Sequence, residues 1–172
     1  MAMLSIDIRE LDRHAIHVDG ALTSDDDVWQ PGDVLPSDGV QATGRLSTAG
    51  VGRYYWHGHI AGTAVASCRR CLTETSVSVE DEAHLLFVST DDPEADDPDV
   101  YTFGPRDQAL DLRPAVRELW LLNVPAYVLC RDGCLGLCPH CGADLNAGPC
   151  SCESGQEAQE ITPQRLDAAP AS

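Results

Sequence analysis

The chain has 172 residues and a hydrophobic fraction of 43%, enough for one ordinary domain with a core and a small appendage. Its 28 acidic residues outnumber 11 basic ones, all of them arginine, and give a formal net charge of −17. This charge repels phosphate backbones and excludes tight binding of bare RNA or DNA over the whole surface, whereas a basic protein partner, or acidity that serves solubility alone, is compatible with it.

The beginning of the chain favours strands and loops. Apolar residues alternate with polar ones over residues 4–8, the period of a half-buried strand, and Ile16 and Val18 predict a second short strand that ends at residues 19–20. Residues 24–39 combine a run of Asp with Pro and Gly, so they predict a loop.

Three longer strands are expected next. Residues 40–48 and 53–67 favour strands, and the glycine-rich residues 49–52 between them predict a hairpin turn. Residues 74–89 repeat the alternating pattern. Residues 90–99 hold six acids and two prolines, which bury nothing, and predict a solvated loop that serves as a spacer.

The best helical pattern covers residues 112–123. Pro114 suits a first helical turn because it has no amide proton to leave unpaired, and the carboxylate of Asp111 lies where the helix dipole favours an acid. Pro125 ends the helix. One face is apolar and predicts core packing; its members are Leu112, Ala115, Val116, Leu119 and Leu122.

These elements predict an α+β fold, with an antiparallel, barrel-like sheet, one main helix and a C-terminal cysteine-rich zinc knuckle. We expect a β-rich domain at residues 1–129, a metal-binding module at 130–152 and a polar, disordered tail at 153–172. No signal peptide is visible in residues 1–14, and the longest apolar stretch is too short to span a bilayer. We therefore expect a cytoplasmic protein, where eight cysteines predict metal ligands or catalytic thiols rather than disulfides.

Cysteine spacing gives the most specific local signal. Cys138 and Cys141 lie two residues apart, and Gly142 after them allows the positive φ that turns backbone amides toward the sulfurs. Cys150 and Cys152 supply a second pair within reach. Four thiolates around a tetrahedral ion close a site, which makes it structural rather than catalytic.

A second group of four is predicted from more distant parts of the chain. Cys68 and Cys71 follow a predicted strand, and Cys130 and Cys134 follow the helix. We expect two zinc ions, each held by four cysteines: Cys68, Cys71, Cys130 and Cys134 at one site, and Cys138, Cys141, Cys150 and Cys152 at the other. The alternative partition combines Cys68 and Cys71 with the pair at 138 and 141.

Paired cysteines can also form a redox pair or hold an iron–sulfur cluster. A redox pair usually needs a helix N-terminus that lowers the pKa of its first thiol, whereas Cys68 lies between two predicted strands. An iron–sulfur cluster also uses four thiolates and stays open as the alternative metal.

Two further pairs of residues are candidates for metal or ligand binding. His57 and His59 share one face of a predicted strand but lack a third ligand nearby, which favours partly exposed histidines over a metal pair. Arg69 and Arg70 are candidate binding residues, either balancing the thiolate charge of their own site or, less favoured, contacting RNA. The sequence contains no nucleophile elbow or phosphate-binding glycine loop.

The order of these motifs resembles the YceD family of large ribosomal RNA subunit accumulation proteins. The likeness covers residues 1–152 and is strongest at 130–152. It rests on the stretches 68–72 (CRRCL), 110–112 (LDL), Glu118, 124–125 (VP) and 130–152 (CRDGCLGLCPHCGADLNAGPCSC).

The resemblance implies a non-enzymatic ribosome biogenesis factor that supports accumulation or processing of large-subunit (23S) rRNA. It also implies a link to a zinc-bearing protein of that subunit. Because the chain contains no lysine, we expect an indirect role, through a basic ribosomal protein or a precursor particle, rather than direct RNA contact. The alternatives are a thiol–disulfide oxidoreductase and a zinc-ribbon interaction module.

Overall fold

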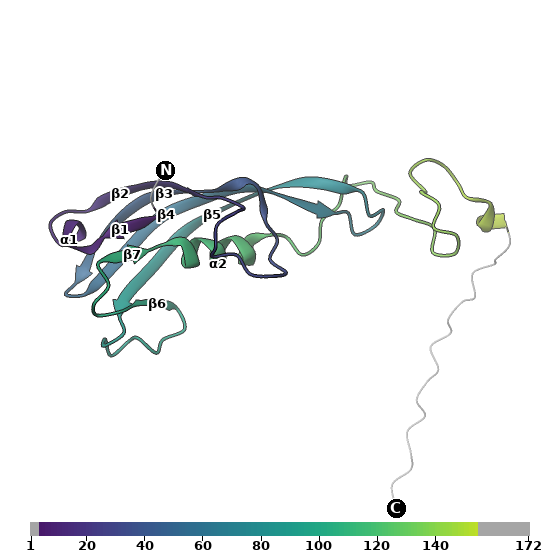
Figure 1. The fold of residues 1–172 in the computed structure, drawn as a ribbon. Helices are drawn as coiled ribbons and strands as arrows, with labels where there is room; N and C mark the ends of the chain where they lie inside the picture. Colours follow the sequence, from purple (N-terminus) through teal and green to yellow (C-terminus); the bar gives the residue numbers. More distant parts are fainter. Residues whose placement is uncertain (1–3, 155–172) are drawn as a thin grey trace, which may run out of the picture.

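A five-stranded sheet dominates the computed structural model, which describes residues 4–154 (Figure 1). Its strands follow the order β2-β3-β4-β5-β6; β6 pairs with β5 in parallel, and the other neighbours are antiparallel. The strands are β2 (Ile16–Leu22), β3 (Pro36–Gly50), β4 (Arg53–Ser67), β5 (Glu74–Ser89) and β6 (Val100–Phe103).

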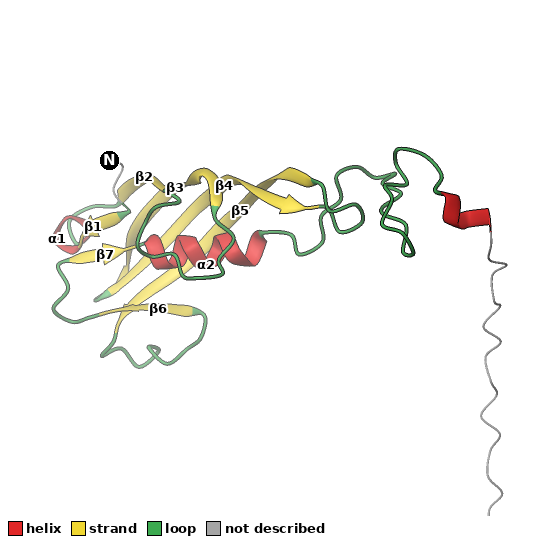
Figure 2. Ribbon diagram, turned by 45° about the vertical axis from the view of Figure 1, so that its right-hand side comes forward, coloured by secondary structure: helices red, strands yellow, loops and turns green. Residues whose placement is uncertain are grey.

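The remaining elements are short, apart from one helix. β1 (Ser5–Asp7) and β7 (Ala109–Asp111) form a separate two-stranded antiparallel sheet. α1 (Ile8–Leu11) follows β1, α2 (Arg113–Asn123) follows β7, and the 3-10 turn η1 (Ser151–Ser154) lies near the end of the described chain. Figure 2 shows α2 lying across one face of the five-stranded sheet.

The α+β composition and the main helix are as predicted, but the sheet is open. β2 and β6 are its two edges, and in the part of the chain that the structure describes no pairing joins them. The expected barrel-like shape is therefore not confirmed. β2 has seven residues and β6 four, and each pairs with a single neighbour, so the edges offer too little strand to close the sheet.

The two longest predicted strands are confirmed, and the shorter predictions need correction. β4 and β5 have the predicted bounds. Ile8 begins α1 instead of ending a strand, because the Asp7 side chain caps the helix by accepting a 2.7 Å hydrogen bond from the Arg9 amide. β2 continues through Gly20 to Leu22, since β3 pairs with it over that length. β3 starts at Pro36, inside the predicted loop, with an irregular register before Val40.

Close backbone contact seats the Trp56 ring in the core. Trp56 is fully buried, and the chain on both sides of its ring is glycine: a Cβ atom at Gly58 would overlap the ring, and one at Gly44 would overlap the backbone of Gly58. The alternation Tyr54, Trp56 and Ile60 then faces the same core. Because neither glycine has a side chain, β3 and β4 approach each other closely, and the Trp56 ring fits between these strands and the rest of the core.

Replacement of Gly58 by alanine should therefore lower the free energy of unfolding by about 1–3 kcal/mol, the usual cost of overpacking a core. Urea unfolding followed by tryptophan fluorescence measures the change. Gly133→Ala is the matched control, because a Cβ atom there meets no atom within 4 Å. Equal stability of the two variants would contradict this account of the Trp56 site.

The helix turns most of the predicted face to the core, since Leu112, Ala115 and Val116 are fully buried, but its last turn differs from the prediction. The Asp111 carboxylate accepts a 3.0 Å hydrogen bond from the Arg113 amide, which stabilises the start of α2. Val116 and Trp120 are fully buried, whereas the predicted core residue Leu122 is 74% exposed. The buried row follows the i, i+4 spacing, and Trp120 fits because Gly62 on β4 has no side chain to meet its ring.

Arginine side chains fasten the acidic loops to the sheet. Arg53, at the start of β4, holds Asp92 at 2.8 Å and Glu94 at 3.0 Å, so the predicted spacer at residues 90–99 is largely exposed but tethered. Arg117 of α2 forms an ion pair with Asp33 at 2.7 Å.

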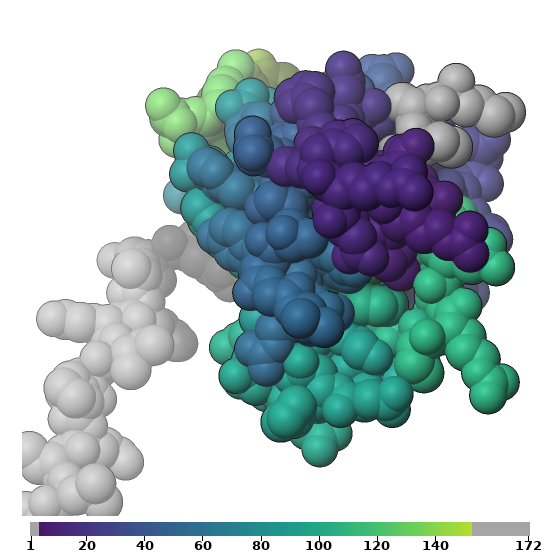
Figure 3. Space-filling model, turned by 90° about the vertical axis from the view of Figure 1, so that its left-hand side faces the viewer, coloured from purple at the N-terminus to yellow at the C-terminus, as the bar shows by residue number. Residues whose placement is uncertain are grey.

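Figure 3 shows the end of the molecule where the β3–β4 hairpin, in blue, lies beside the segment after β5, in teal.

The cysteine-rich residues 130–152 extend from the end of the sheet at which β4 stops (Figure 1). Apart from one bridge between Leu137 and Asp144 and the turn η1, they contain no regular structure. Of the predicted tail at 153–172, residues 155–172 lie outside the described range. No helix among the described residues is long and apolar enough to cross a membrane.

Candidate metal centres

The first centre joins the turn after β4 to the segment after α2. Cys68 and Cys71 occupy a tight turn closed by hydrogen bonds from the Cys68 amide to the Thr73 carbonyl, 2.8 Å, and from the Leu72 amide to the Cys68 carbonyl, 2.9 Å. The Arg69 amide donates to the Val128 carbonyl at 2.8 Å, which holds the second segment against this turn. The local chain thus orients the sulfurs toward one another without any disulfide.

Sulfur spacing at this centre suits one tetrahedral ion. Cys68 Sγ lies 3.8 Å from Cys134 Sγ, and Cys71 Sγ lies 3.5 Å from Cys130 Sγ. All four sulfurs lie within 4.8 Å of one another. Zinc–sulfur bonds of about 2.3 Å give a tetrahedron with edges of about 3.8 Å. The donors therefore fit a four-thiolate metal site with no open coordination position.

The pKa values of two thiols in this group shift in opposite directions. Hydrogen bonding from the Cys71 amide lowers the pKa of Cys68 to about 6, while the hydrogen bond with the Cys71 side chain raises the pKa of Cys130 to about 12. The pKa values of Cys68 and Cys130 thus shift in opposite directions, because adjacent negative charges repel. A divalent ion removes that conflict and lets all four sulfurs ionise.

The second centre lies within the C-terminal module. Cys138 and Cys141 form a turn that ends at Gly142, whose φ of +72° matches the expected left-handed conformation. The Cys138 amide donates to the Ala143 carbonyl at 2.8 Å, and the Gly142 amide donates to the Cys138 carbonyl at 2.9 Å. These sulfurs and those of Cys150 and Cys152 also lie within 4.8 Å of one another.

The same pattern of opposite pKa shifts recurs at the second centre. The backbone amide of Cys141 lowers the pKa of Cys138 to about 6, whereas the hydrogen bond with the Cys141 side chain raises the pKa of Cys152 to about 12. Cys138 is 5% exposed but Cys141 is on the surface, so this site is the more open of the two. Thiolate ligands alone favour zinc or iron over calcium or magnesium.

The structure brings the eight cysteines together in the two groups preferred from the sequence, and the alternative partition is not found. That these residues bind metal stays a prediction. All ligand candidates in both groups are cysteines, with no carboxylate or imidazole among them. Such a set supplies structural cross-links: four protein sulfurs leave no position for substrate or water.

Asn146, which the cysteine spacing does not single out, joins the loop between Cys141 and Cys150 to the first centre. Its side-chain amide donates to Cys134 Sγ at 3.6 Å and to the Asp144 carboxylate at 2.7 Å, while its Oδ1 accepts a 2.8 Å hydrogen bond from the Leu135 amide. A hydrogen bond to a ligating sulfur orients it and stabilises its negative charge. The only available signal is that Asn146 lies between cysteine pairs in sequence, which does not reveal its contacts.

The candidate binding arginines turn toward the main chain. Arg69 Nε donates to the Ala126 carbonyl at 3.0 Å, and one terminal nitrogen of Arg70 donates to the Cys134 carbonyl at 2.8 Å. The Arg70 carbonyl in turn accepts a 3.0 Å hydrogen bond from the Leu137 amide. Both side chains therefore join the turn after β4 to the segments that carry the other cysteines.

The two strand histidines lie on the exposed face of the sheet. His57 and His59 are both exposed, as expected, and the His57 ring stacks on His84 of β5 at 4.5 Å between centroids. His84 Nδ1 is hydrogen-bonded to the Tyr55 hydroxyl at 2.8 Å. Within residues 4–154, the groups with metal-ligand spacing are the two cysteine groups alone.

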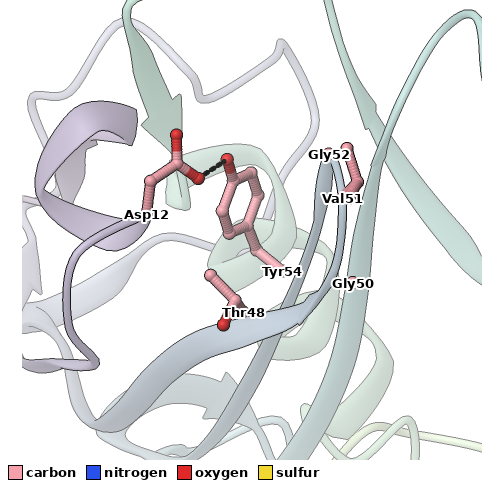
Figure 4. Close-up of a pocket in the computed structure, with 6 residues that line it drawn as sticks. All are labelled: Asp12, Thr48, Gly50, Val51, Gly52 and Tyr54. Carbon is pink, nitrogen blue, oxygen red and sulfur yellow. Dashed lines mark hydrogen bonds between the residues drawn. The ribbon is translucent and has the colours of Figure 1, made fainter.

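A shallow hollow of about 590 Å³ lies beside the β3–β4 hairpin (Figure 4). The Tyr54 hydroxyl donates a 2.8 Å hydrogen bond to Asp12 there, and burial raises the pKa of this phenol to about 12. Its other lining residues are Thr48, Gly50, Val51 and Gly52. This lining lacks a base paired with a nucleophile, so the hollow has no constellation for covalent catalysis.

Comparison with known proteins identifies the family. The model of the family described as large ribosomal RNA subunit accumulation protein YceD matches residues 56–167. The chain belongs to the YceD family. The match starts within β4 and includes β5, α2 and all eight cysteines.

Individual relatives of this YceD protein are distant. An uncharacterized protein of Mycobacterium tuberculosis and one of Mycobacterium bovis are each 29% identical over 108 residues, 62% of this chain and 50% of the relative. A chloroplastic YCED homolog of Arabidopsis thaliana, named as a large ribosomal RNA subunit accumulation protein, is 31% identical over 49% of this chain and 35% of its own length. The chain spans about half the length or less of these relatives, and no solved structure matches it.

Metal content should separate the two centres. Cys71→Ser and Cys141→Ser are each expected to reduce bound zinc from two ions per chain to one, because each centre loses one of four ligands. The double variant should bind none. Elemental analysis of anaerobically purified protein, with a free-thiol count, measures the effect.

Ser78→Ala, on the exposed side of β5, is the control and should keep both ions. Folded wild-type protein without metal would refute the centres. Loss of both ions from one single variant would refute their independence.

Proposed function

We propose that this YceD protein is a non-enzymatic ribosome biogenesis factor that supports accumulation of 23S rRNA in the cytoplasm. The observation that carries the proposal is the family match over residues 56–167, which contains the main helix and both cysteine groups. The family description and the name of the Arabidopsis relative both refer to large ribosomal RNA subunit accumulation.

The two cysteine groups have a structural part in this proposal. Each holds one zinc ion and fixes loops that contain little other structure. A structural zinc site contributes on the order of 10 kcal/mol to folding, comparable with the stability of a whole domain. Residues 130–152 bury few large side chains, so metal supplies the order that a hydrophobic core supplies elsewhere.

Charge favours an indirect route to the RNA. The formal net charge is −17, and two four-thiolate zinc sites take it to roughly −21, since each adds four thiolate charges and one divalent ion. Arg53, Arg113 and Arg117 pair with carboxylates, so these cations are not free to bind phosphates. The protein therefore acts through a basic ribosomal protein or a precursor particle that carries one.

Thiol–disulfide chemistry is the competing function, because a Cys68 pKa of about 6 is also typical of a redox cysteine. The two functions differ in their thiols. Metal-bound cysteines resist alkylation and do not reduce insulin, whereas a redox pair does both rapidly. The convergence of Cys130 and Cys134 on Cys68 and Cys71 favours metal, since a redox pair needs two sulfurs and not four.

Deletion of the gene should lower mature 23S rRNA relative to 16S rRNA, with precursor particles accumulating in sucrose gradients. The wild-type gene should restore the ratio, and the double variant Cys71→Ser/Cys141→Ser should not, because the proposed role needs the folded metal module. Ser78→Ala serves as the control that restores it. A normal subunit profile after clean deletion would exclude the proposed function.

A further inference from the structure

An apolar groove lies where the sheet, the main helix and the first cysteine centre meet. Its volume is about 400 Å³. The walls are the end of β4, the turn from Cys68 to Leu72, the segment at Val34 and the chain that leaves α2. The lining residues from the end of α2 and the chain after it are Leu121, Val124, Pro125 and Ala126.

Exposed apolar side chains of the described chain gather at this groove. Val34, Val65 and Leu72 line it and are 39%, 48% and 65% exposed. Leu35, Leu122 and Tyr127, also exposed, are each next in sequence to a lining residue. Three of the nine large hydrophobic residues that are exposed in residues 4–154 thus line this one groove. Such a concentration on a monomer marks a binding surface, since single exposed apolar residues are ordinary but a cluster is not.

Leu72 has an unusual backbone. Its φ is +62°, and among the described residues it is the only residue other than glycine with a positive φ. A leucine in this conformation costs about 1 kcal/mol or more, and glycine, found at the matching place after Cys141, would avoid that cost. The turn therefore tolerates strain in order to hold an apolar side chain at the rim of the groove.

The groove also contains a strand edge. The pairing of β3 with β4 ends at Pro36 and Ala64, whereas β5 continues to pair with β4 as far as Ser67. Residues 65–67 therefore pair on one side alone and line the groove. An exposed edge of this kind accepts an extended peptide as an added strand, with the alternate side chains of the peptide entering apolar pockets.

Charge selects the kind of peptide. Glu74, opposite Ser67 in the ladder, and Asp38, next to the irregular start of β3, are both exposed. Arg69, the one charged residue in the lining, has its Nε bonded to the Ala126 carbonyl. The net charge of −17 steers basic partners toward the molecule and acidic ones away.

We propose that this groove binds an extended, lysine- or arginine-rich segment of a basic partner protein, whose apolar residues contact Val65 and Leu72 beside the strand edge. The inference rests on the proposed function and names its docking site. Cys68 lies in the wall of the groove, so the metal at the first centre holds the docking surface in shape.

Peptide titration of the zinc-loaded full chain tests the site. The probe is a short peptide of alternating Lys and Val, and its controls replace Val by Ser or Lys by Glu. In amide NMR spectra the Lys–Val peptide should shift the signals of residues 65–67 and 72. Both control peptides should bind at least about tenfold more weakly, because each lacks one of the two recognised features.

Leu72→Asn is the sharpest variant, because asparagine tolerates the positive φ but presents no apolar side chain. It should bind the Lys–Val peptide about tenfold more weakly while keeping both zinc ions and at least wild-type stability. Val65→Thr should weaken binding while preserving the strand. Val51→Asn, on a fully exposed hairpin residue, is the matched control and should bind normally.

Several results would overturn the inference. These are equal binding of the Lys–Val and Glu–Val peptides, shifts confined to other surfaces, unchanged binding by Leu72→Asn, or a single-stranded RNA that shifts residues 65–72 where the peptide does not. The peptide titration can succeed or fail whatever the outcome of the gene deletion. Full rescue of 23S rRNA by Leu72→Asn would reject the groove and leave the proposed function intact, whereas a normal profile after gene deletion rejects the function itself.

Discussion

Four sulfur atoms within 4.8 Å of one another cannot all be ionised unless a cation lies among them, and much of this structure depends on that constraint. At the first centre, the sulfurs of Cys68 and Cys71, at the end of the sheet, converge with those of Cys130 and Cys134, which come after the helix. The hydrogen bonds of Arg69 and Arg70 to main-chain carbonyls support the same junction. The junction of the C-terminal module with the sheet therefore rests on the cysteine group and these hydrogen bonds more than on apolar packing.

Two of the few arginine side chains form ion pairs with acidic loops. Arg53 and Arg117 neutralise carboxylates from loops far away in sequence, and thereby hold residues 90–94 and Asp33 on the sheet and helix. Because they are largely used in this way, they leave a surface that is strongly acidic. Exposed ion pairs contribute little to stability individually, so their main effect is to position loops.

The groove beside Leu72 brings these features together. The cysteine-bearing turn holds a leucine in a strained conformation, the end of β3 pairing leaves the last residues of β4 paired on one side, and the acidic surface favours a basic ligand. This free edge lies on β4, inside the strand order, and exists because β3 stops pairing with β4 before β5 does.

The sequence alone determined the features that local patterns encode: β4 and β5 from their alternation, the extent of α2 from its proline and apolar period, and the two cysteine groups from paired spacing. Features that depend on partners distant in the chain came from the three-dimensional fold. β6 and β7 are too short to show a period, Trp120 replaces Leu122 in the core because Gly62 makes room for its ring, and Asn146 reaches Cys134 through a fold that its neighbours in sequence do not reveal. The groove likewise exists because β3 stops pairing at Pro36, a limit set by three-dimensional packing rather than by residue pattern.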